Sequence, residues 1–328
     1  MPLHALPSRR CVLSGLAAVV MAPASACAQP YPSKPIRIVV PYPAGGSIDA
    51  LARLLAQELQ AANGWTVVVE NKAGASGAVG TREVAKAEAD GHTLVLGTNQ
   101  THATNAVLLK EPGYDPVASF VPIAGLADLQ HALVVPKGSP AGNVADLIAL
   151  ARKEPGKLNY GSTGNGSASH LAMELFKTKT GTDMQHVAFR GAAPLSLELV
   201  AGRIDAAFST LPTVIALIES GELRALAVAS DRRASQLPNV PTLADAGVAG
   251  GEADAWTGLF APAGTPAEIA GVLGKAVSAA LGKPDLAAAA LKQGIAVNVR
   301  AAAAFAAFQR AEVEKWAQVA RLAKVVVE

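Results

Sequence analysis

The sequence predicts an α/β protein built from two lobes, and three observations support this prediction. Near the start of the chain, short apolar runs alternate with helical patterns in the order β-α-β-α-β, which is typical of a parallel sheet with right-handed crossovers. The alternation restarts after Pro122. The 328 residues are enough for two domains, and their composition, 51% hydrophobic and 16% charged, allows a large core and excludes a disordered chain.

The first unit follows a proline-rich leader. An apolar run at 36–42 ends in Pro and Gly and predicts a buried strand. A helix is predicted over 48–62, because Leu51, Leu55 and Leu59 recur at helical spacing and share a face. The other predicted elements of this unit are strands at 66–70 and 93–98 and a helix at 77–89 that ends at Asp90-Gly91.

The second unit has the same alternation, and the chain then returns to the first. Predicted strands lie at 132–135, 158–161, 184–189, 204–209 and 223–229, with helices at 144–153 and 167–178. After a proline-rich turn, a strand is predicted at 256–261 and helices at 266–281 and 301–324. The last helix carries Phe305, Phe308 and Trp316 on or near one apolar face, which we expect to face the core.

Two extended segments join the units, so we expect a bilobal protein whose first lobe is completed by the C-terminal part. The predicted boundaries are 29–130 together with 232–328 for lobe I, and 131–231 for lobe II. In open α/β sheets, ligands bind beyond the carboxyl ends of the strands. We therefore expect the ligand in a central cleft between the lobes.

The N-terminus has the order of an export signal. Arg9 and Arg10 precede an apolar run of about a dozen residues, which is too short to span a bilayer, and Ala26-Cys27-Ala28 is an A-x-A cleavage pattern. We predict a signal peptide at 1–28, and its residues fit a twin-arginine (Tat) signal and an ordinary Sec signal alike. A lipoprotein signal at Cys27 is the alternative, although no large apolar residue precedes it closely. We expect a periplasmic protein.

Cysteine content and charge exclude several classes of function. Both cysteines, Cys11 and Cys27, lie in the predicted signal, so the mature chain has no disulfide, thiolate metal site or cysteine nucleophile. Its 26 basic residues then balance 26 acidic ones, and only 4% of the residues are aromatic. These features argue against nucleic-acid and anionic-membrane partners. The histidines have no metal-ligand spacing, so we expect neither metal nor cofactor.

Two glycine- and serine-rich turns each join a predicted strand to a predicted helix. In the first, Gly45 and Gly46 let the backbone approach a ligand closely, and Ser47 is predicted to cap the helix. Free N–H groups and the positive end of the helix dipole suit a carboxylate or phosphate there, although a simple capped turn has the same sequence. Asp49 does not suit an anion. It favours the helix dipole or accepts a hydrogen bond from a ligand ammonium or hydroxyl.

The second turn runs from Tyr160 to His170 and contains three glycines. The turn does not match the complete dinucleotide-binding motif Gly-x-Gly-x-x-Gly/Ala, because Ser169 occupies the last position. It also lacks the sequences of a phosphate-binding loop and of a nucleophile elbow. One turn in each lobe predicts a clamp for a small dicarboxylate or other carboxylic acid. The predicted contacts beyond the first turn are Ser162, Gly166 and Ser167, with Thr98, Asn99, Arg190 and Ser209 at other strand ends.

Three alternatives accompany this interpretation. Arg190 either pairs with a ligand carboxylate or forms a structural salt bridge. If Ser167 and His170 formed a nucleophile–base pair, the protein would be an exported hydrolase. Neighbours on a helix seldom have the geometry that such a pair needs, so we favour a packed or cap-bonded His170. A dinucleotide-dependent enzyme is disfavoured by the export signal and the incomplete fingerprint.

Several long motifs occur in order along the chain. They are the stretch from Tyr31 to Asp49, Val69-Glu-Asn-Lys-Ala-Gly74, Asp90-Gly-His-Thr-Leu94, the stretch from Leu158 to Leu171, Leu223-Arg-Ala-Leu-Ala-Val228 and Leu237-Pro-Asn-Val-Pro-Thr242. Together they resemble those of the periplasmic solute-binding receptors of the tripartite tricarboxylate transporter family, the Bug proteins. The resemblance implies a bilobal, type II-like periplasmic binding protein that is no enzyme. It implies a small carboxylate ligand, held largely by backbone amides of the two glycine-rich turns.

The resemblance also implies how the receptor works. The lobes close on the ligand, and the closed form docks to a membrane permease or a sensor, with the receptor expected to be a monomer. It carries the ligand contacts onto Gly45, Gly46, Ser47, Asp49, Ser162, Gly166 and Ser167, and includes His170 only as a frequent family residue. Two departures concern the ligand: Ser209-Thr210 stands where many members have an Asp, and the 99–105 loop is unusually polar.

Overall fold

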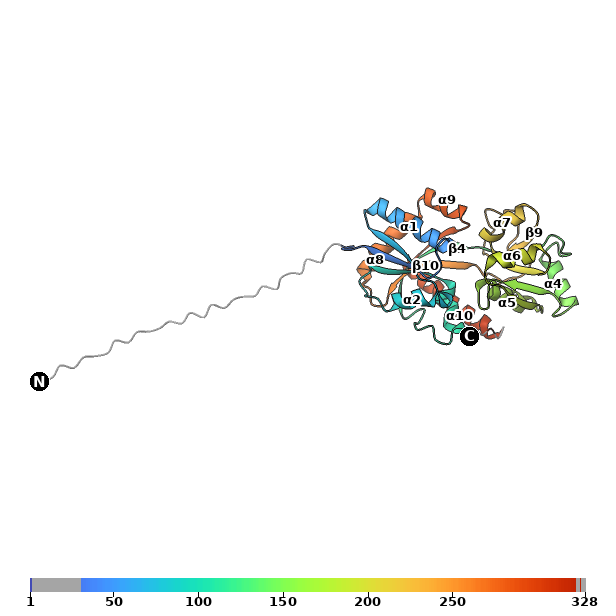
Figure 1. Ribbon diagram of the computed structural model, residues 1–328, viewed down its shortest axis with the longest axis horizontal. Coiled ribbons are helices and arrows are strands. Elements are labelled where there is room, and N and C mark those ends of the chain that lie inside the picture. Colours follow the sequence, from blue (N-terminus) through green and yellow to red (C-terminus); the bar gives the residue numbers. More distant parts are fainter. Residues whose placement is uncertain (2–30, 323–324, 326–328) are drawn as a thin grey trace.

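The computed structural model describes residue 1, residues 31–322 and residue 325, so the predicted signal peptide at 1–28 lies outside the described residues apart from Met1. Figure 1 shows two lobes side by side, each a sheet with helices packed on it. The strands of the first lobe are β1 Ile36–Val40, β2 Val67–Asn71, β3 Thr93–Thr98, β4 Phe120–Leu129, β10 Ala255–Pro262 and β11 Ala296–Ala301. Its sheet has the order β11-β4-β10-β3-β1-β2.

The second sheet is built from the middle of the chain. Its strands are β5 His131–Pro136, β6 Asn159–Ser162, β7 Gln185–Ala188, β8 Ala206–Thr210 and β9 Leu223–Val228, in the order β7-β6-β8-β5-β9. Its helices are α4 Val144–Lys153, α5 Ala168–Thr180, α6 Ala192–Val200 and α7 Leu211–Glu219. The first lobe carries α1 Ser47–Asn63, α2 Ala78–Ala85, α3 Asn105–Leu108, α8 Ala267–Leu281, α9 Pro284–Lys292 and α10 Ala302–Leu322, with short helical turns at Ala75–Gly77 and Gln100–Thr104.

The two-lobed α/β prediction is confirmed, but the first sheet is mixed and not wholly parallel. Strands β1, β2 and β3 are parallel as predicted, whereas β10 runs antiparallel to β3 and β4, and β11 runs antiparallel to β4. Strands β4 and β11 and helix α9 were not predicted from the sequence. Strand β4 is a ten-residue strand that lies between β11 and β10, and its Gly, Ala and Pro residues weaken its strand pattern.

The pairing of the strands fixes which edge of each sheet faces the other lobe. In the first sheet, Leu129 at the end of β4 lies opposite Ala255 at the start of β10, and Thr98 at the end of β3 lies close by, opposite Thr257. The chain crosses between the lobes at this edge, and β1 and β2 also end there because they are parallel to β3. The carboxyl ends of these parallel strands therefore point toward the second lobe.

The second sheet has the matching arrangement. Strand β5 begins directly after the crossing, and its first residue, His131, lies opposite Thr210 at the end of β8. Because β6 is parallel to both β8 and β7, all three strands end at the edge that faces the first lobe. The strand–helix turns that follow β1 and β6 consequently lie on the two sides of the junction between the lobes.

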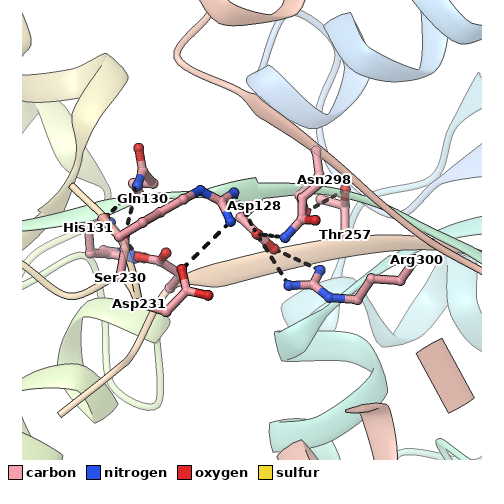
Figure 2. Close-up of polar contacts among 11 residues, drawn as sticks. Asp128, Gln130, His131, Ser230, Asp231, Thr257, Asn298 and Arg300 are labelled. Atoms are coloured by element: carbon pink, nitrogen blue, oxygen red, sulfur yellow. Dashed lines mark hydrogen bonds and ion pairs between the residues drawn. The ribbon is translucent and has the colours of Figure 1, made fainter. Parts of the chain in front are cut away.

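Hydrogen bonds tie the crossing segments together. Gln130 donates to the Ser230 hydroxyl at 3.0 Å, and the backbone N–H of His131 donates to the Asp254 carboxylate at 3.0 Å. Beside them, Asp128 accepts two hydrogen bonds from Arg300, at 3.0 and 3.3 Å, and one from Asn298 (Figure 2). These contacts join the two crossing segments to each other and β11 to the end of β4.

The segment that follows β9 lies against the second sheet before it returns to the first lobe. Thr242 forms a parallel bridge with Val228, and Leu243 donates its N–H to the Val228 carbonyl. The N–H of Ala253 likewise donates to the carbonyl of Ala229. The return to the first sheet is complete only at β10, which begins at Ala255.

The last helix packs as the sequence predicts. Phe305 and Trp316 are fully buried, and Phe308 packs against them as a partly buried residue. The same apolar cluster contains Phe176 of α5, and α10 contacts both α5 and β4. The C-terminal helix therefore lies against both lobes at their junction. Among the described helices, none is both long and apolar enough to cross a membrane.

Candidate functional site

The first glycine-rich turn leaves a row of backbone donors without partners. Helix α1 begins at Ser47 and its N-cap is Gly46, which provides no side-chain cap. The prediction that Ser47 caps the helix is therefore wrong by one position. Within the described part of the chain, the N–H groups of Gly46, Ser47 and Ile48 have no hydrogen-bond partner. These donors and the helix dipole can together hold an anion.

Asp49 holds this turn in place. Its buried carboxylate accepts hydrogen bonds from the Gly45 N–H at 2.9 Å, from Arg53 at 3.0 Å and from Asn71 at 2.9 Å. Hydrogen bonding from Arg53 is the largest effect that lowers the pKa of Asp49, which falls to about 2. Gly45 has a φ of 85°, a conformation that only glycine adopts readily. The turn is therefore fixed by residues of α1 and β2, and ligand contact by Asp49 stays a prediction.

The end of β3 lies beside this turn. The Thr98 hydroxyl is hydrogen-bonded to the Tyr42 hydroxyl at 2.6 Å, which links the ends of β1 and β3. Asn99 is only 3% exposed, yet its side chain has no hydrogen-bond partner among the described residues. The rest of the polar 99–105 loop turns inward, where His102 is fully buried and stacks on Phe260. Burial lowers the pKa of His102 to about 3, so it stays uncharged.

The second turn uses most of its polar groups internally. The Ser162 hydroxyl is bonded to His186 and to Gly164, and the Gly166 N–H donates to Nδ1 of His170 at 3.0 Å. Ser167 is the N-cap of α5, and its hydroxyl accepts from the His170 N–H at 3.3 Å. The donors that remain free in the described residues are the backbone N–H groups of Ala168 and Ser169.

His170 is packed and bonded as predicted, and it forms no nucleophile–base pair with Ser167. Its Nδ1 is occupied by the Gly166 N–H, and the Ser167 hydroxyl is bonded to the backbone N–H of His170 and to the Ser169 hydroxyl, not to the imidazole. His170 is 5% exposed and stacks on His186. Burial lowers the pKa of His170 to about 3, so the ring is neutral. This geometry gives the hydrolase alternative no support.

Arg190 and Ser209 lie at the ends of strands in the second lobe. Arg190 is exposed, and no carboxylate among the described residues pairs with it, so the structural salt bridge considered for it is absent there. Ser209 is 4% exposed, and its hydroxyl has no hydrogen-bond partner in the described part of the chain. Ligand contact by both side chains stays a prediction.

Sequence reasoning missed several residues of the site. Asn71 links Asp49 to the Tyr42 carbonyl from the end of β2, and only its place in the 69–74 motif hinted at a role. The free N–H groups of Ala168 and Ser169 belong to the first turn of α5, where any residue offers a donor. A rule based on position after the N-cap would have found these two donors, whereas their side-chain identity carries no signal.

Comparison with known proteins gives the family. The sequence profile of the family described as "Tripartite tricarboxylate transporter family receptor" matches residues 51–324. Protein BugT of Bordetella pertussis (strain Tohama I) is 34% identical over 303 residues, which cover 92% of this chain and 92% of BugT. The fold and the site define a bilobal solute-binding protein. The chain belongs to the tripartite tricarboxylate transporter receptor family.

Solved structures agree with this assignment. The chain is similar to Rpa4515 of R. palustris, solved with adipate, with a TM-score of 0.78 and 38% identity, covering 90% of this chain and 100% of that one. It is also similar to MatC (Rpa3494) of Rhodopseudomonas palustris, solved with bound malate, with a TM-score of 0.74 and 32% identity over 88% of this chain and 99% of that one. The family consists of solute-binding receptors and not of enzymes.

Proposed function

We propose that this protein is an exported receptor that binds a small dicarboxylate between its lobes, with one carboxylate at the start of each helix, α1 and α5. The observation that carries this proposal is the pair of free backbone donor sets. Gly46, Ser47 and Ile48 supply one set, and Ala168 and Ser169 supply the other. Both follow strands that end at the edge between the lobes. Backbone donors at helix N-termini bind carboxylates without a paired cation.

The ligands of similar proteins support a dicarboxylate. Adipate and malate, named with the two structures described above, both carry two carboxylates. Ser209 stands where many members of the family have an Asp, whose carboxylate would attract the ammonium group of an amino-acid ligand. Because this chain has no acidic residue there, we expect acids without an amino group to bind best. The proposed contacts are Gly45, Gly46, Ser47, Asp49, Thr98, Asn99, Ser162, Gly166, Ser167, Arg190 and Ser209.

Lobe closure completes the proposed mechanism. The lobes turn on the segments around Gln130 and between Ala229 and Asp254, and the closed form docks to a membrane permease or a sensor. The division into 29–130 with 232–328 and 131–231 is the starting hypothesis. The bridge between Val228 and Thr242 supports moving the second boundary toward Ala255, because the intervening segment packs on the second sheet. We propose a monomer without cofactor or metal, exported to the periplasm by the signal at 1–28.

Thermal melts and calorimetric titration test the proposal. A ligand present at about 100 times its Kd stabilises the folded state by about 2.7 kcal/mol, which raises Tm by several degrees. We expect this rise with adipate or a related dicarboxylate, and a smaller one with monocarboxylates of equal length. Flat melts across a broad panel of organic acids, with a rise for sugars or zinc, would contradict the proposal.

A further inference from the structure

Three aromatic rings stack beneath the second glycine-rich turn. The imidazoles of His170, on α5, and His186, on β7, lie 3.7 Å apart between centroids and 9° from parallel. The ring of Tyr160, on β6, lies 4.9 Å from that of His186 and 6.1 Å from that of His170, and is roughly parallel to both. The Tyr160 hydroxyl is in turn bonded to Glu174. The stack joins three elements of the second lobe directly below the turn, and the binding site described so far makes no use of it.

The two imidazoles hold opposite ends of the turn. Nε2 of His186 lies 2.6 Å from the Ser162 hydroxyl, which donates to the Gly164 carbonyl at 3.0 Å and accepts from the Gly164 N–H at 3.2 Å. Nδ1 of His170 accepts from the Gly166 N–H at 3.0 Å. Gly164 and Gly166 have φ values of 145° and 72°, so the peptide between the two anchors has the freedom of glycine.

The bond to Gly166 also fixes the protonation of His170. An N–H donor requires a lone pair on Nδ1, so the ring is neutral and carries its proton on Nε2. The charged and titratable groups that face the stack are Glu174 and Lys177 of α5 and the Tyr160 hydroxyl. Burial is the main cause that lowers the pKa of both histidines, and Lys177 lowers both further. The pair is therefore uncharged at neutral pH.

We propose that His170 and His186 are positioning residues for the second ligand-binding turn. By holding the two ends of the turn, they fix its backbone where the N–H groups of Ala168 and Ser169 stay free for the ligand. A pre-ordered turn loses less conformational entropy on binding than a glycine-rich turn that must first be ordered. This inference rests on the proposed carboxylate site, but it assigns a role to residues that do not touch the ligand.

Two substitutions of His170 separate positioning from packing. His170→Asn places an amide oxygen near the position of Nδ1 and keeps an acceptor for the Gly166 N–H, whereas His170→Leu fills similar space without one. With adipate as the probe in calorimetric titration at pH 7, we expect at least a 10-fold weaker Kd for His170→Leu. His170→Asn should restore binding to within about threefold of the wild type. Equal affinity of the Leu and wild-type proteins, or equal losses in both variants, would overturn the proposal.

Amide exchange and NMR keep the test independent of the ligand. If the wild-type protein binds no acid, the proposed function fails, but the Gly166 amide still reports on the anchor. We expect this amide to exchange at least 10-fold faster in His170→Leu than in the wild type, and little faster in His170→Asn. In the ¹⁵N-labelled wild-type protein, His170 should be protonated on Nε2 and not on Nδ1. Protonation on Nδ1, or unchanged Gly166 exchange in a folded Leu variant, contradicts the positioning role.

Discussion

Replacing Gly46 with valine is the most direct test of the clamp, because the structure separates its effect on folding from its effect on binding. Gly46 has φ −80° and ψ 168°, an extended conformation that valine adopts readily. An added Cβ meets only the Pro43 carbonyl oxygen, at 3.8 Å. Valine is a poorer N-cap than glycine, so we expect a loss of stability of about 1 kcal/mol or less.

Binding should suffer far more than stability. The isopropyl group adds bulk at the N-cap, next to the free N–H groups of Gly46, Ser47 and Ile48, and should crowd a carboxylate bound there. A hydrogen bond to a charged group contributes about 1.5–3 kcal/mol, so losing one carboxylate contact of about 2–3 kcal/mol weakens Kd by about 30- to 150-fold. Calorimetric titration with a dicarboxylate and with a monocarboxylate of equal length measures the loss for each.

Gly138→Val is the matched control. Gly138 is exposed in the turn after β5, and an added Cβ there meets nothing within 4 Å. The control should bind both acids like the wild type. A folded Gly46→Val protein that binds the dicarboxylate with unchanged Kd would refute the argument that the start of α1 holds a carboxylate, and it would leave the family assignment intact.

The other predictions concern single side chains. Ser167→Ala removes the side-chain cap of α5 and should cost about 1 kcal/mol of stability, seen as a Tm lower by about 2–4 °C. Arg190→Gln should leave Tm unchanged, because Arg190 is exposed and has no carboxylate partner in the described residues, but weaken dicarboxylate binding; an unchanged Kd would remove it from the site. Asp49 has a pKa lowered to about 2, chiefly by its hydrogen bond from Arg53, so its contribution to stability is present above pH 4 and lost as the pH falls toward 2. Urea melts of Asp49→Asn should accordingly show a flatter dependence on pH over that window. Burial is the main cause that raises the pKa of Asp254 to about 7. Between about pH 4 and 7 the Asp254 carboxyl is therefore protonated in the folded protein but ionised in the unfolded chain, so the free energy of unfolding falls as the pH rises through that range. The stability of Asp254→Asn minus that of the wild type, measured by urea melts, should therefore be larger at pH 8 than at pH 5. The same difference at both pH values would contradict the raised pKa.

Much of the fold was predictable because its signals are local. The helix over 48–62 and the strand at 93–98 follow from hydrophobic periodicity and flanking turn residues, and the structure places α1 at Ser47–Asn63 and β3 at Thr93–Thr98. Strand β4 was missed because its sequence, with Pro122 and Gly125 among small residues, has weak strand propensity. Its place inside the sheet, next to the edge strand β11, is stabilised by pairing with β10 and β11, which are distant in sequence.

The sequence by itself determined where the two glycine-rich turns lie and which family the chain resembles. Those turns are short runs of glycine and serine between a strand and a helix, so their signal is contained in neighbouring residues. It did not determine which donors in them are free. Asp49 takes the N–H of Gly45, and His170 takes that of Gly166. Each acceptor lies only four residues along the chain from its donor, but a backbone N–H looks the same in every residue and the sequence does not show which side chain turns onto it. Only the tertiary structure decided this, because Asn71 holds the Asp49 carboxylate and His186 stacks on His170.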